Sequence, residues 1–161
     1  AIILESSYFQ ATVPVIVVDN SFKELLRLLK IFYGDPCENL VLTGVTGTDG
    51  KTTTCAIINH LLNGRFNSAL IGTNGIIYNE KTYPNLFTTP LLSESYRLLN
   101  EFVRQGISHA TMEVSSEGII GKRIETIRFD YAIFTNLSHE HLNTTKPWMS
   151  ISQPNFNCLN T

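Results

Sequence analysis

The sequence predicts an α/β fold in which helices flank a mostly parallel sheet. From residue 40 onward, short apolar runs alternate with segments of helical periodicity, a pattern typical of parallel strands joined by helices. The run at 40–45 passes through a glycine-rich turn directly into a helical segment. The run at 131–134, Tyr-Ala-Ile-Phe, is apolar at every position, as in strands that a parallel sheet buries on both faces.

The beginning of the chain carries two short strand patterns and one helix pattern. Residues 1–4 and 15–18 are β-branched runs separated by polar residues, and each predicts a strand. Ser21 and Glu24 have the spacing of a capping box, so we expect a helix with Ser21 as its cap. The helix has an apolar face made of Leu25, Leu26, Leu28, Leu29 and Phe32. Turn residues then make 34–39 the best candidate for a domain boundary.

Between that boundary and residue 114, six further elements are expected. They are a strand at 40–45, a helix at about 51–63, a strand at about 69–72, a hairpin around 78–81, a helix that Ser93 caps and Gly106 ends, and a strand at about 109–114. Residues 143–161 are rich in Asn, Ser, Thr and Pro and show no period, so we expect a poorly ordered tail.

Size and charge limit the classes of function. With 161 residues, 43% of them hydrophobic, the chain can form one core and an appendage. The 12 basic and 14 acidic residues form no basic patch along the sequence, so nucleic acid is not an expected partner. No apolar stretch reaches the roughly 18 residues of a membrane span, and no membrane association is expected. We expect a monomer.

The cysteines indicate the redox compartment, and the first residue bears on how the chain originates. Cys37, Cys55 and Cys158 are odd in number and form no C-x-x-C pair, which fits neither a disulfide framework nor a zinc knuckle. A reducing cytoplasm is the expected compartment. The chain begins with Ala1 rather than Met, which suggests an excerpt of a longer product or a processed start.

The strongest local signal is the segment 44–52, G-V-T-G-T-D-G-K-T, between a strand and a helix. Glycines let backbone N–H groups converge on phosphate oxygens, and the helix adds the positive end of its dipole. Lys51 would neutralise the β- and γ-phosphates, and the Thr52 hydroxyl would bind magnesium. The strict pattern has Gly where Val45 stands, so this is a variant P-loop. The alternative is a tight turn with a solvated lysine.

Two other strand ends carry polar residues. Glu113, within M-E-V-S-S, ends a predicted strand at the edge where open α/β sheets bind ligands, either as a magnesium ligand or as a solvated acid. The segment 134–142, F-T-N-L-S-H-E-H-L, follows the next strand. Its two histidines alone are a weak metal signal, because surface histidines are the commoner outcome. Thr88-Thr89-Pro90 reads on its own as a turn.

Taken in order, these four motifs resemble those of the Mur ligases, and M-E-V-S-S with T-T-P is similar to the UDP-N-acetylmuramoyl-peptide ligase (MurE-type) group. They cover about residues 44–142. Five positions depart from the family pattern: Asp49 stands for Asn, Glu117 for His, Gly121 for Gln, and Glu140 and Asn143 for Asp. The phosphate loop alone, without T-T-P and M-E-V-S-S, would also fit cyanophycin-type or folylpolyglutamate-type ligases.

The resemblance implies a set of site residues. The ATP phosphates would contact Gly47, Thr48, Asp49, Gly50, Lys51, Thr52, Thr53 and Asn136. Thr52, Glu113 and His141 would hold magnesium, and Lys51, Glu113 and His141 would be catalytic. The sugar-nucleotide substrate would contact Thr88, Thr89, Ser115 and Arg123.

The resemblance also implies an activity and a domain arrangement. The reaction would be ATP- and Mg²⁺-dependent addition of a diamino acid to UDP-N-acetylmuramoyl-L-alanyl-D-glutamate, through an acyl phosphate, in peptidoglycan synthesis. Residues 1–36 would end an N-terminal UDP-sugar-binding domain, 37–142 would be part of the central ATP-binding domain, and 143–161 an irregular tail. The modified lysine of the central domain and the amine-binding domain have no counterpart in the sequence. We therefore expect a truncated chain that is inactive alone, or a non-catalytic remnant that binds nucleotide.

Overall fold

A computed structural model describes residues 1–6 and 12–138 of the chain. The chain divides into two compact units, Ala1–Gly34 and a second that begins at Asp35. The predicted tail at 143–161 and the predicted site residue His141 lie outside the described residues. Within the described part, no helix is long and apolar enough to cross a membrane.

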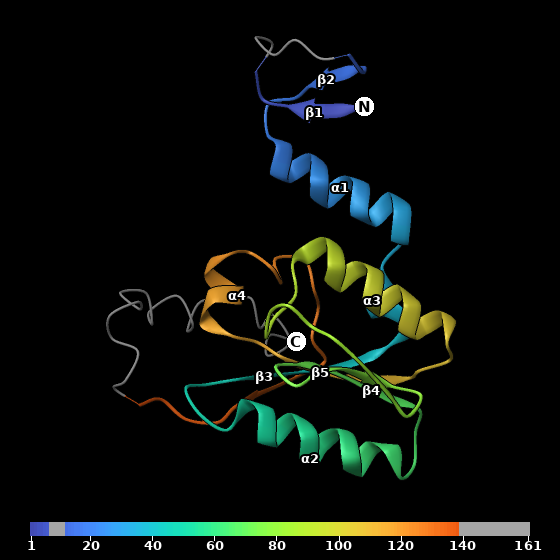
Figure 1. Ribbon diagram of the computed structural model, residues 1–161, viewed down its shortest axis with the longest axis vertical. Coiled ribbons are helices and arrows are strands. Elements are labelled where there is room, and N and C mark those ends of the chain that lie inside the picture. The colour runs from blue at the N-terminus through green and yellow to red at the C-terminus, as the bar shows by residue number, and fades with distance from the viewer. Residues whose placement is uncertain (7–11, 139–161) are drawn as a thin grey trace. The chain divides into compact units, whose positions relative to one another are not determined.

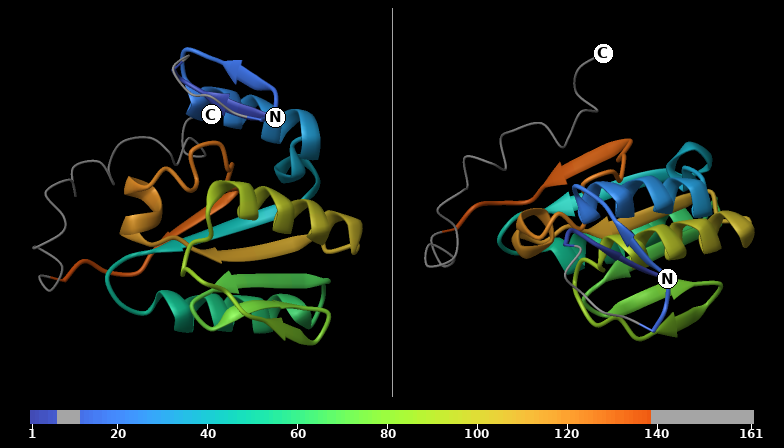
Figure 2. Two further views of the ribbon diagram at one scale, coloured as in Figure 1. Left: turned by 45° about the horizontal axis from the view of Figure 1, so that its top comes forward. Right: turned by 90° about the horizontal axis from the view of Figure 1, so that it is seen from above.

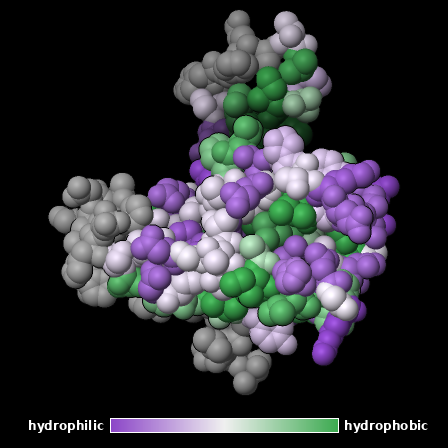
Figure 3. Space-filling model, turned by 60° about the horizontal axis from the view of Figure 1, so that its bottom comes forward, coloured by the Kyte–Doolittle hydropathy of each residue, from purple (hydrophilic) through white to green (hydrophobic). Residues whose placement is uncertain are grey.

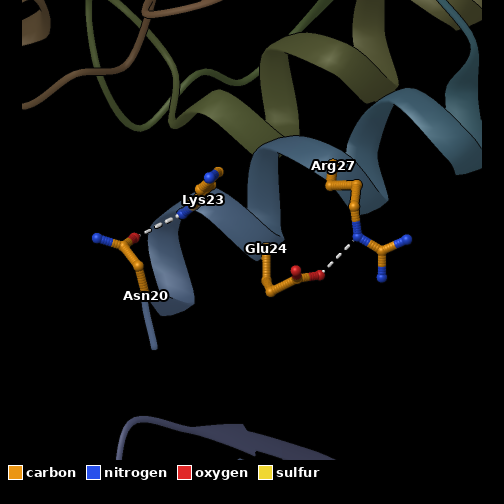
Figure 4. A network of polar contacts seen from close by, with 4 residues as sticks. All are labelled: Asn20, Lys23, Glu24 and Arg27. Carbon is orange, nitrogen blue, oxygen red and sulfur yellow. Dashed lines mark hydrogen bonds and ion pairs between the residues drawn. The ribbon is translucent and has the colours of Figure 1, made fainter. Parts of the chain in front are cut away.

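The first unit contains two strands, β1 (Ile2–Leu4) and β2 (Val15–Val17), which pair in parallel, and the helix α1 (Ser21–Tyr33). The cap of α1 differs from the prediction. Asn20 is the N-cap, and its Oδ1 accepts a hydrogen bond from the Lys23 N–H at 2.7 Å (Figure 4). Ser21 lies inside the helix because its backbone is already helical, and its N–H donates to Glu5 instead. Glu24 pairs with Arg27 at 2.7 Å, so no capping box forms.

The second unit is built on a six-stranded sheet with the strand order β6-β5-β4-β7-β3-β8. The strands are β3 (Val41–Thr46), β4 (Ser68–Gly72), β5 (Gly75–Tyr78), β6 (Lys81–Tyr83), β7 (His109–Glu113) and β8 (Tyr131–Phe134). The four strands from β4 to β8 in this order are parallel, whereas β5 and β6 form an antiparallel hairpin extension. The residues of the hairpin turn, Asn79 and Glu80, have positive φ, as a tight two-residue turn requires.

Helices cover both faces of this sheet, which confirms the predicted α/β class. They are η1 (Pro36–Asn39), α2 (Lys51–Asn63), α3 (Leu92–Arg104) and α4 (Ser116–Ile120). The helix α2 lies on one face, and α3 and α4 lie on the other (Figures 1 and 2). On the side of α2, apolar and polar side chains are interspersed (Figure 3), and Ile57 and Leu61 are exposed there.

The two faces of the sheet have separate apolar contacts. Cys55 of α2 packs with Val45 of β3 and Leu70 of β4 in one buried cluster. On α3, Tyr96, Leu98, Leu99 and Phe102 are buried, at the spacing of one helix face. Ser93 lies within α3 and does not cap it, contrary to the prediction. The helix begins at Leu92, and its N-cap Leu91 makes no side-chain capping bond.

The strand β8 also differs from the prediction. It pairs with β3 and stands last in the strand order, so it is an edge strand in the described part of the sheet. Tyr131 is 62% exposed and Phe134 is 55% exposed, so the apolar run is not buried on both faces. The short helix α4 was not predicted, and Ser115 caps it by accepting a hydrogen bond from the Gly118 N–H.

Candidate nucleotide and metal site

The topology places the predicted motifs at one edge of the sheet. Because β3, β7 and β8 are parallel neighbours, their carboxyl ends meet at that edge, with Val45 beside Glu113 and Thr46 beside Phe134. The phosphate loop follows β3, the M-E-V-S-S motif ends β7, and the segment Thr135–Ser138 follows β8. These three segments therefore lie next to one another, as the strand-end rule predicts.

The phosphate loop turns from β3 into α2 through two glycines with positive φ, Gly47 at 135° and Gly50 at 81°. At Gly47 a Cβ would also collide with the Thr135 hydroxyl, so only glycine fits this turn. The helix ladder of α2 begins where the Thr54 N–H donates to the Gly50 carbonyl at 2.9 Å. The N–H groups of the three preceding residues of α2 come before that ladder, at the positive end of the helix dipole.

Lys51 binds the loop itself in this structure. Its ammonium donates to the carbonyls of Gly47 and Thr48, both at 2.8 Å. The positive charge of Lys51 therefore lies at the turn, within the loop that the sequence pattern predicts to bind phosphate. An incoming phosphate oxygen would replace these two carbonyls as the partner of the ammonium, since a charged acceptor forms the stronger hydrogen bond.

The segment after β8 fastens the phosphate loop. The Asn136 amide binds the backbone of Asp49 twice, accepting from its N–H at 3.0 Å and donating to its carbonyl at 3.2 Å. The Thr48 N–H donates to the Asn136 carbonyl at 2.9 Å, and the Thr135 hydroxyl donates to the Asp49 carbonyl at 2.6 Å. The family resemblance implies that Asn136 contacts the nucleotide. In this structure its amide holds the loop in shape, and two loop N–H groups point at this segment.

Glu113 is the buried acid of the site, with a side chain that is 0% exposed. Its Oε2 accepts hydrogen bonds from the Thr52 hydroxyl at 2.9 Å and from the Thr73 hydroxyl at 3.1 Å. Its Oε1 accepts from the Thr73 N–H at 2.9 Å. A buried carboxylate needs such donors, because removing a charge from water without partners is costly. The alternative that Glu113 is a solvated strand-end acid is therefore wrong.

Thr52 and Glu113 fit the requirements of a magnesium ion. Mg²⁺ prefers oxygen ligands and usually takes only one or two protein groups beside phosphates and water. The carboxylate and the hydroxyl lie in direct contact at the start of α2, next to the phosphate loop. Residues 1–6 and 12–138 contain no group of three or more His, Cys, Asp and Glu side chains that could hold a metal without phosphate.

The residues predicted to bind the sugar nucleotide lie beside Glu113. The Thr89 hydroxyl is buried and joins the chain on both sides of it, donating to the Glu113 carbonyl at 2.9 Å and accepting from the Ser115 N–H at 2.8 Å. Arg123 donates to the Thr89 carbonyl at 2.9 Å and lies over the Phe87 ring, 4.5 Å from its centroid. These contacts hold Thr89 and Ser115 in place, whereas Thr88 and Arg123 are partly exposed.

Cys55 lies beneath the site but cannot act as a nucleophile there. Burial above all, and the negative charge of Glu113, raise the pKa of its thiol to about 12, although the positive charge of Lys51 acts to lower it. The thiol therefore stays protonated near neutral pH, and only the thiolate is an effective nucleophile. Burial likewise raises the pKa of the Cys37 thiol, to about 11.

Thr73 is the residue that the sequence analysis missed. It follows β4 directly, so the strand-end rule that selected the other motifs also applies to it. The segment T-N-G that begins with Thr73 reads as a turn and contains no charged residue, so the sequence gave no sign of a functional site there.

A comparison with known families matches residues 45–153 to the Mur ligase middle domain. The chain belongs to the Mur ligase family. The matched region begins inside β3 and includes the phosphate loop, Thr73, Glu113 and Asn136. Val45, the departure from the strict P-loop pattern, is the first residue of that region.

Similar proteins within this family carry names of cell-wall precursor ligases. The chain is 46% identical over 132 residues to a protein of Oceanobacillus iheyensis named UDP-N-acetylmuramyl-tripeptide synthetase 2, and the match covers 80% of this chain and 27% of that protein. It is 40% identical over 132 residues to a Geobacillus thermodenitrificans protein named UDP-N-acetylmuramoyl-L-alanyl-D-glutamate--2,6-diaminopimelate ligase, covering 81% of this chain and 27% of that one.

A solved structure of a UDP-N-acetylmuramoyl-L-alanyl-D-glutamate--2,6-diaminopimelate ligase has a TM-score of 0.72 to this Mur ligase chain, with 27% sequence identity. The match covers 90% of this chain and 30% of that one. The chain thus spans about a quarter of the length of the curated relatives it matches.

Proposed function

We propose that this chain is the nucleotide-phosphate part of an ATP-dependent amide ligase that adds a diamino acid to UDP-N-acetylmuramoyl-L-alanyl-D-glutamate. The contact between Thr52 and Glu113 carries the proposal, because it joins a phosphate loop to a carboxylate of the kind that holds Mg²⁺. The names of the relatives supply the acceptor and the diamino acid. Residues 1–36 would then be the end of a UDP-sugar-binding domain.

The phosphate loop would position ATP and spread its charge. The N–H groups that open α2 would bind phosphate oxygens, and the Lys51 ammonium would exchange the carbonyls of Gly47 and Thr48 for the β- and γ-phosphates. Hydrogen bonds with Asn136 and Thr135 hold the loop in one conformation, so the loop would lose little conformational entropy when ATP binds.

Thr52 and Glu113 would hold Mg²⁺, and His141 is added to this set by family resemblance alone. When bound, Mg²⁺ neutralises charge on the transferred phosphoryl group. The substrate carboxylate attacks the γ-phosphorus and forms an acyl phosphate. The bond between the γ-phosphorus and the ADP oxygen breaks, and ADP leaves. The amine of the diamino acid then attacks the acyl carbon, and inorganic phosphate leaves. Thr88, Thr89, Ser115 and Arg123 would position the acceptor.

The proposal is tested by trapping the acyl phosphate with hydroxylamine, which needs no amine-binding site. The chain is incubated with ATP, Mg²⁺, the UDP-N-acetylmuramoyl-dipeptide and hydroxylamine, and the hydroxamate is measured by mass spectrometry. We expect a hydroxamate that depends on ATP and is lost in Lys51→Ala. With diaminopimelate or lysine in place of hydroxylamine, we expect no amide product at enzyme-like rates of about 1 per second or faster.

Two results would count against the proposal. ATP binding without hydroxamate would mean that this chain binds nucleotide but does not activate a carboxylate, as a non-catalytic remnant would. A hydroxamate on a pteroyl-glutamate but not on the UDP-linked dipeptide would favour a folylpolyglutamate-type ligase.

A further inference from the structure

Thr73 makes three polar contacts at the centre of the site. Its N–H donates to Glu113 Oε1 at 2.9 Å, and its hydroxyl donates to Glu113 Oε2 at 3.1 Å. The same hydroxyl lies 3.0 Å from the hydroxyl of Thr88. Thr73 is itself exposed, whereas Glu113 is buried. It therefore stands between the buried acid and a residue predicted to bind the sugar nucleotide.

The direction of these hydrogen bonds follows from the number of protons available. A carboxylate only accepts, and a threonine hydroxyl has one proton to donate. Since Thr73 gives its proton to Glu113, Thr88 must donate in the contact between the two hydroxyls. The bonds thus run from Thr88 to Thr73 to Glu113. Thr88 is left with lone pairs that can accept a hydrogen bond from an N–H or O–H group of a ligand.

Gly72, the residue before Thr73, also restricts the position of the carboxylate. A Cβ at Gly72 would lie 2.8 Å from the Glu113 carboxyl carbon and would collide with Oε1, so the carboxylate rests directly against this part of the backbone. Of about four acceptor sites on a carboxylate, Thr52 and Thr73 fill three. The remaining site is on Oε1, which accepts only the Thr73 N–H among the contacts above.

We propose that Thr73 is a positioning residue that orients Glu113 for a divalent cation and sets Thr88 as a hydrogen-bond acceptor toward the substrate. The proposal rests on the proposed function, in which Glu113 holds Mg²⁺ beside the phosphates. By holding both oxygens of the acid, Thr73 leaves one lone pair of Oε1 for the cation. Partners of this kind orient metal ligands, and their loss typically costs about 10- to 100-fold in metal affinity or activity.

The test measures cation affinity directly, with Mn²⁺ as the probe. Mn²⁺ is titrated into the chain at saturating ATP and followed by electron paramagnetic resonance, and ATP binding without metal is measured by calorimetry. Thr73→Val keeps the shape of the side chain and removes the hydroxyl, so we expect Mn²⁺ affinity to fall by about tenfold or more. Thr73→Ser keeps the hydroxyl and should restore it, and metal-free ATP affinity should be the same in all three proteins.

Two further variants show whether the loss passes through Glu113. In Glu113→Gln, adding Thr73→Val should cause no further loss of Mn²⁺ affinity, since the residues act as one unit. Thr82→Val makes the same chemical change on the exposed strand β6 and should leave binding unchanged. If Thr73→Val does not fold, as judged by its melting curve, Thr73→Ala and Thr88→Val replace it, with a smaller loss expected for Thr88→Val because it reaches Glu113 only through Thr73.

The outcomes separate the two proposals. Cation-dependent ATP binding that Thr73→Val leaves unchanged would overturn the role of Thr73 and keep the proposed function. A loss that Thr73→Ser does not restore would also overturn it, because the hydroxyl would not be the cause. An unaltered chain that binds ATP equally well with and without Mn²⁺ would overturn the proposed function, and the role of Thr73 with it.

Discussion

The hydroxyl of Thr52 donates a hydrogen bond to the buried carboxylate of Glu113 at 2.9 Å, across 61 positions of sequence. This contact joins the first turn of α2 to the end of β7. It brings side by side the two oxygen-bearing groups that we propose as ligands of a magnesium ion.

Glu113→Gln should separate metal binding from stability. The amide has nearly the shape of the carboxylate, and hydroxyl groups can turn to accept from its NH₂, so the melting temperature should shift by no more than about 4 °C, equivalent to roughly 1 kcal/mol. The Mg²⁺-dependent part of ATP binding should fall, because an amide oxygen carries no charge. Calorimetry with and without Mg²⁺ measures it, with Glu125→Gln as the control. A large loss of melting temperature with intact Mg²⁺ dependence would make Glu113 a structural residue.

Gly72→Ala should destabilise the second unit. The new Cβ would collide with Glu113, and overpacking of this kind costs about 1–3 kcal/mol. Gly64→Ala is the matched control, since its φ is −71° and its Cβ would lie 3.6 Å from the nearest atom, an ordinary contact. Thermal unfolding should show a lower melting temperature for Gly72→Ala only. Equal melting temperatures would contradict the close packing of Glu113 against the backbone.

Asn136→Ala should loosen the phosphate loop. The substitution removes both side-chain bonds to the Asp49 backbone. Hydrogen exchange should accelerate at the Asp49 amide and change little in the middle of α2, because opening of the loop exposes only the loop. Metal-free ATP affinity should fall as well, since the loop must then be ordered on binding. Asn100→Ala on α3 serves as a control. Unchanged exchange at Asp49 would show that the amide does not hold the loop.

The buried thiols should resist modification up to high pH. In a Cys158→Ser background, Cys37 and Cys55 have pKa values raised to about 11 and about 12, so both stay protonated and buried at pH 8. Disulfide-exchange reagents should react at least about 100-fold more slowly than with the denatured chain. Because both values lie above the ordinary 9.0, their contribution to stability is complete below pH 9 and is lost as the pH rises toward 12. Rapid labelling at pH 8 would contradict this burial.

The sequence predicted the features that depend on local pattern and on strand ends. The phosphate loop, Glu113 and the segment after β8 were each found by their place after an apolar strand, and parallel pairing then brought them together. The exact caps were missed at Ser21 and Ser93. A helix can begin one residue earlier or later, depending on the local backbone angles. The sequence pattern does not determine those angles, so it does not show which residue is the cap.

Features that depend on the strand order were not predictable from one sequence. The apolar run of β8 resembled a central strand, and only the order β7-β3-β8 places it at the edge of the sheet formed by the described residues. Thr73 lies 40 positions from Glu113, and the two meet because β4 and β7 are neighbours. The hydrogen bond between the Asn136 amide and the Asp49 backbone likewise joins residues that are 87 positions apart.

The phosphate loop is the central feature of the proposed site, and Lys51→Ala tests its role most directly. ATP is titrated into the unaltered chain and into Lys51→Ala, each with and without Mg²⁺, and binding is measured by calorimetry, with Lys81→Ala on the exposed strand β6 as the charge control. We predict that Lys51→Ala weakens Mg²⁺-ATP binding by tenfold or more, about 1.4 kcal/mol, while its melting curve shows a folded protein at the temperature of the titration and Lys81→Ala binds normally. Equal affinity of Lys51→Ala and the unaltered chain would contradict the assignment of this loop to phosphate.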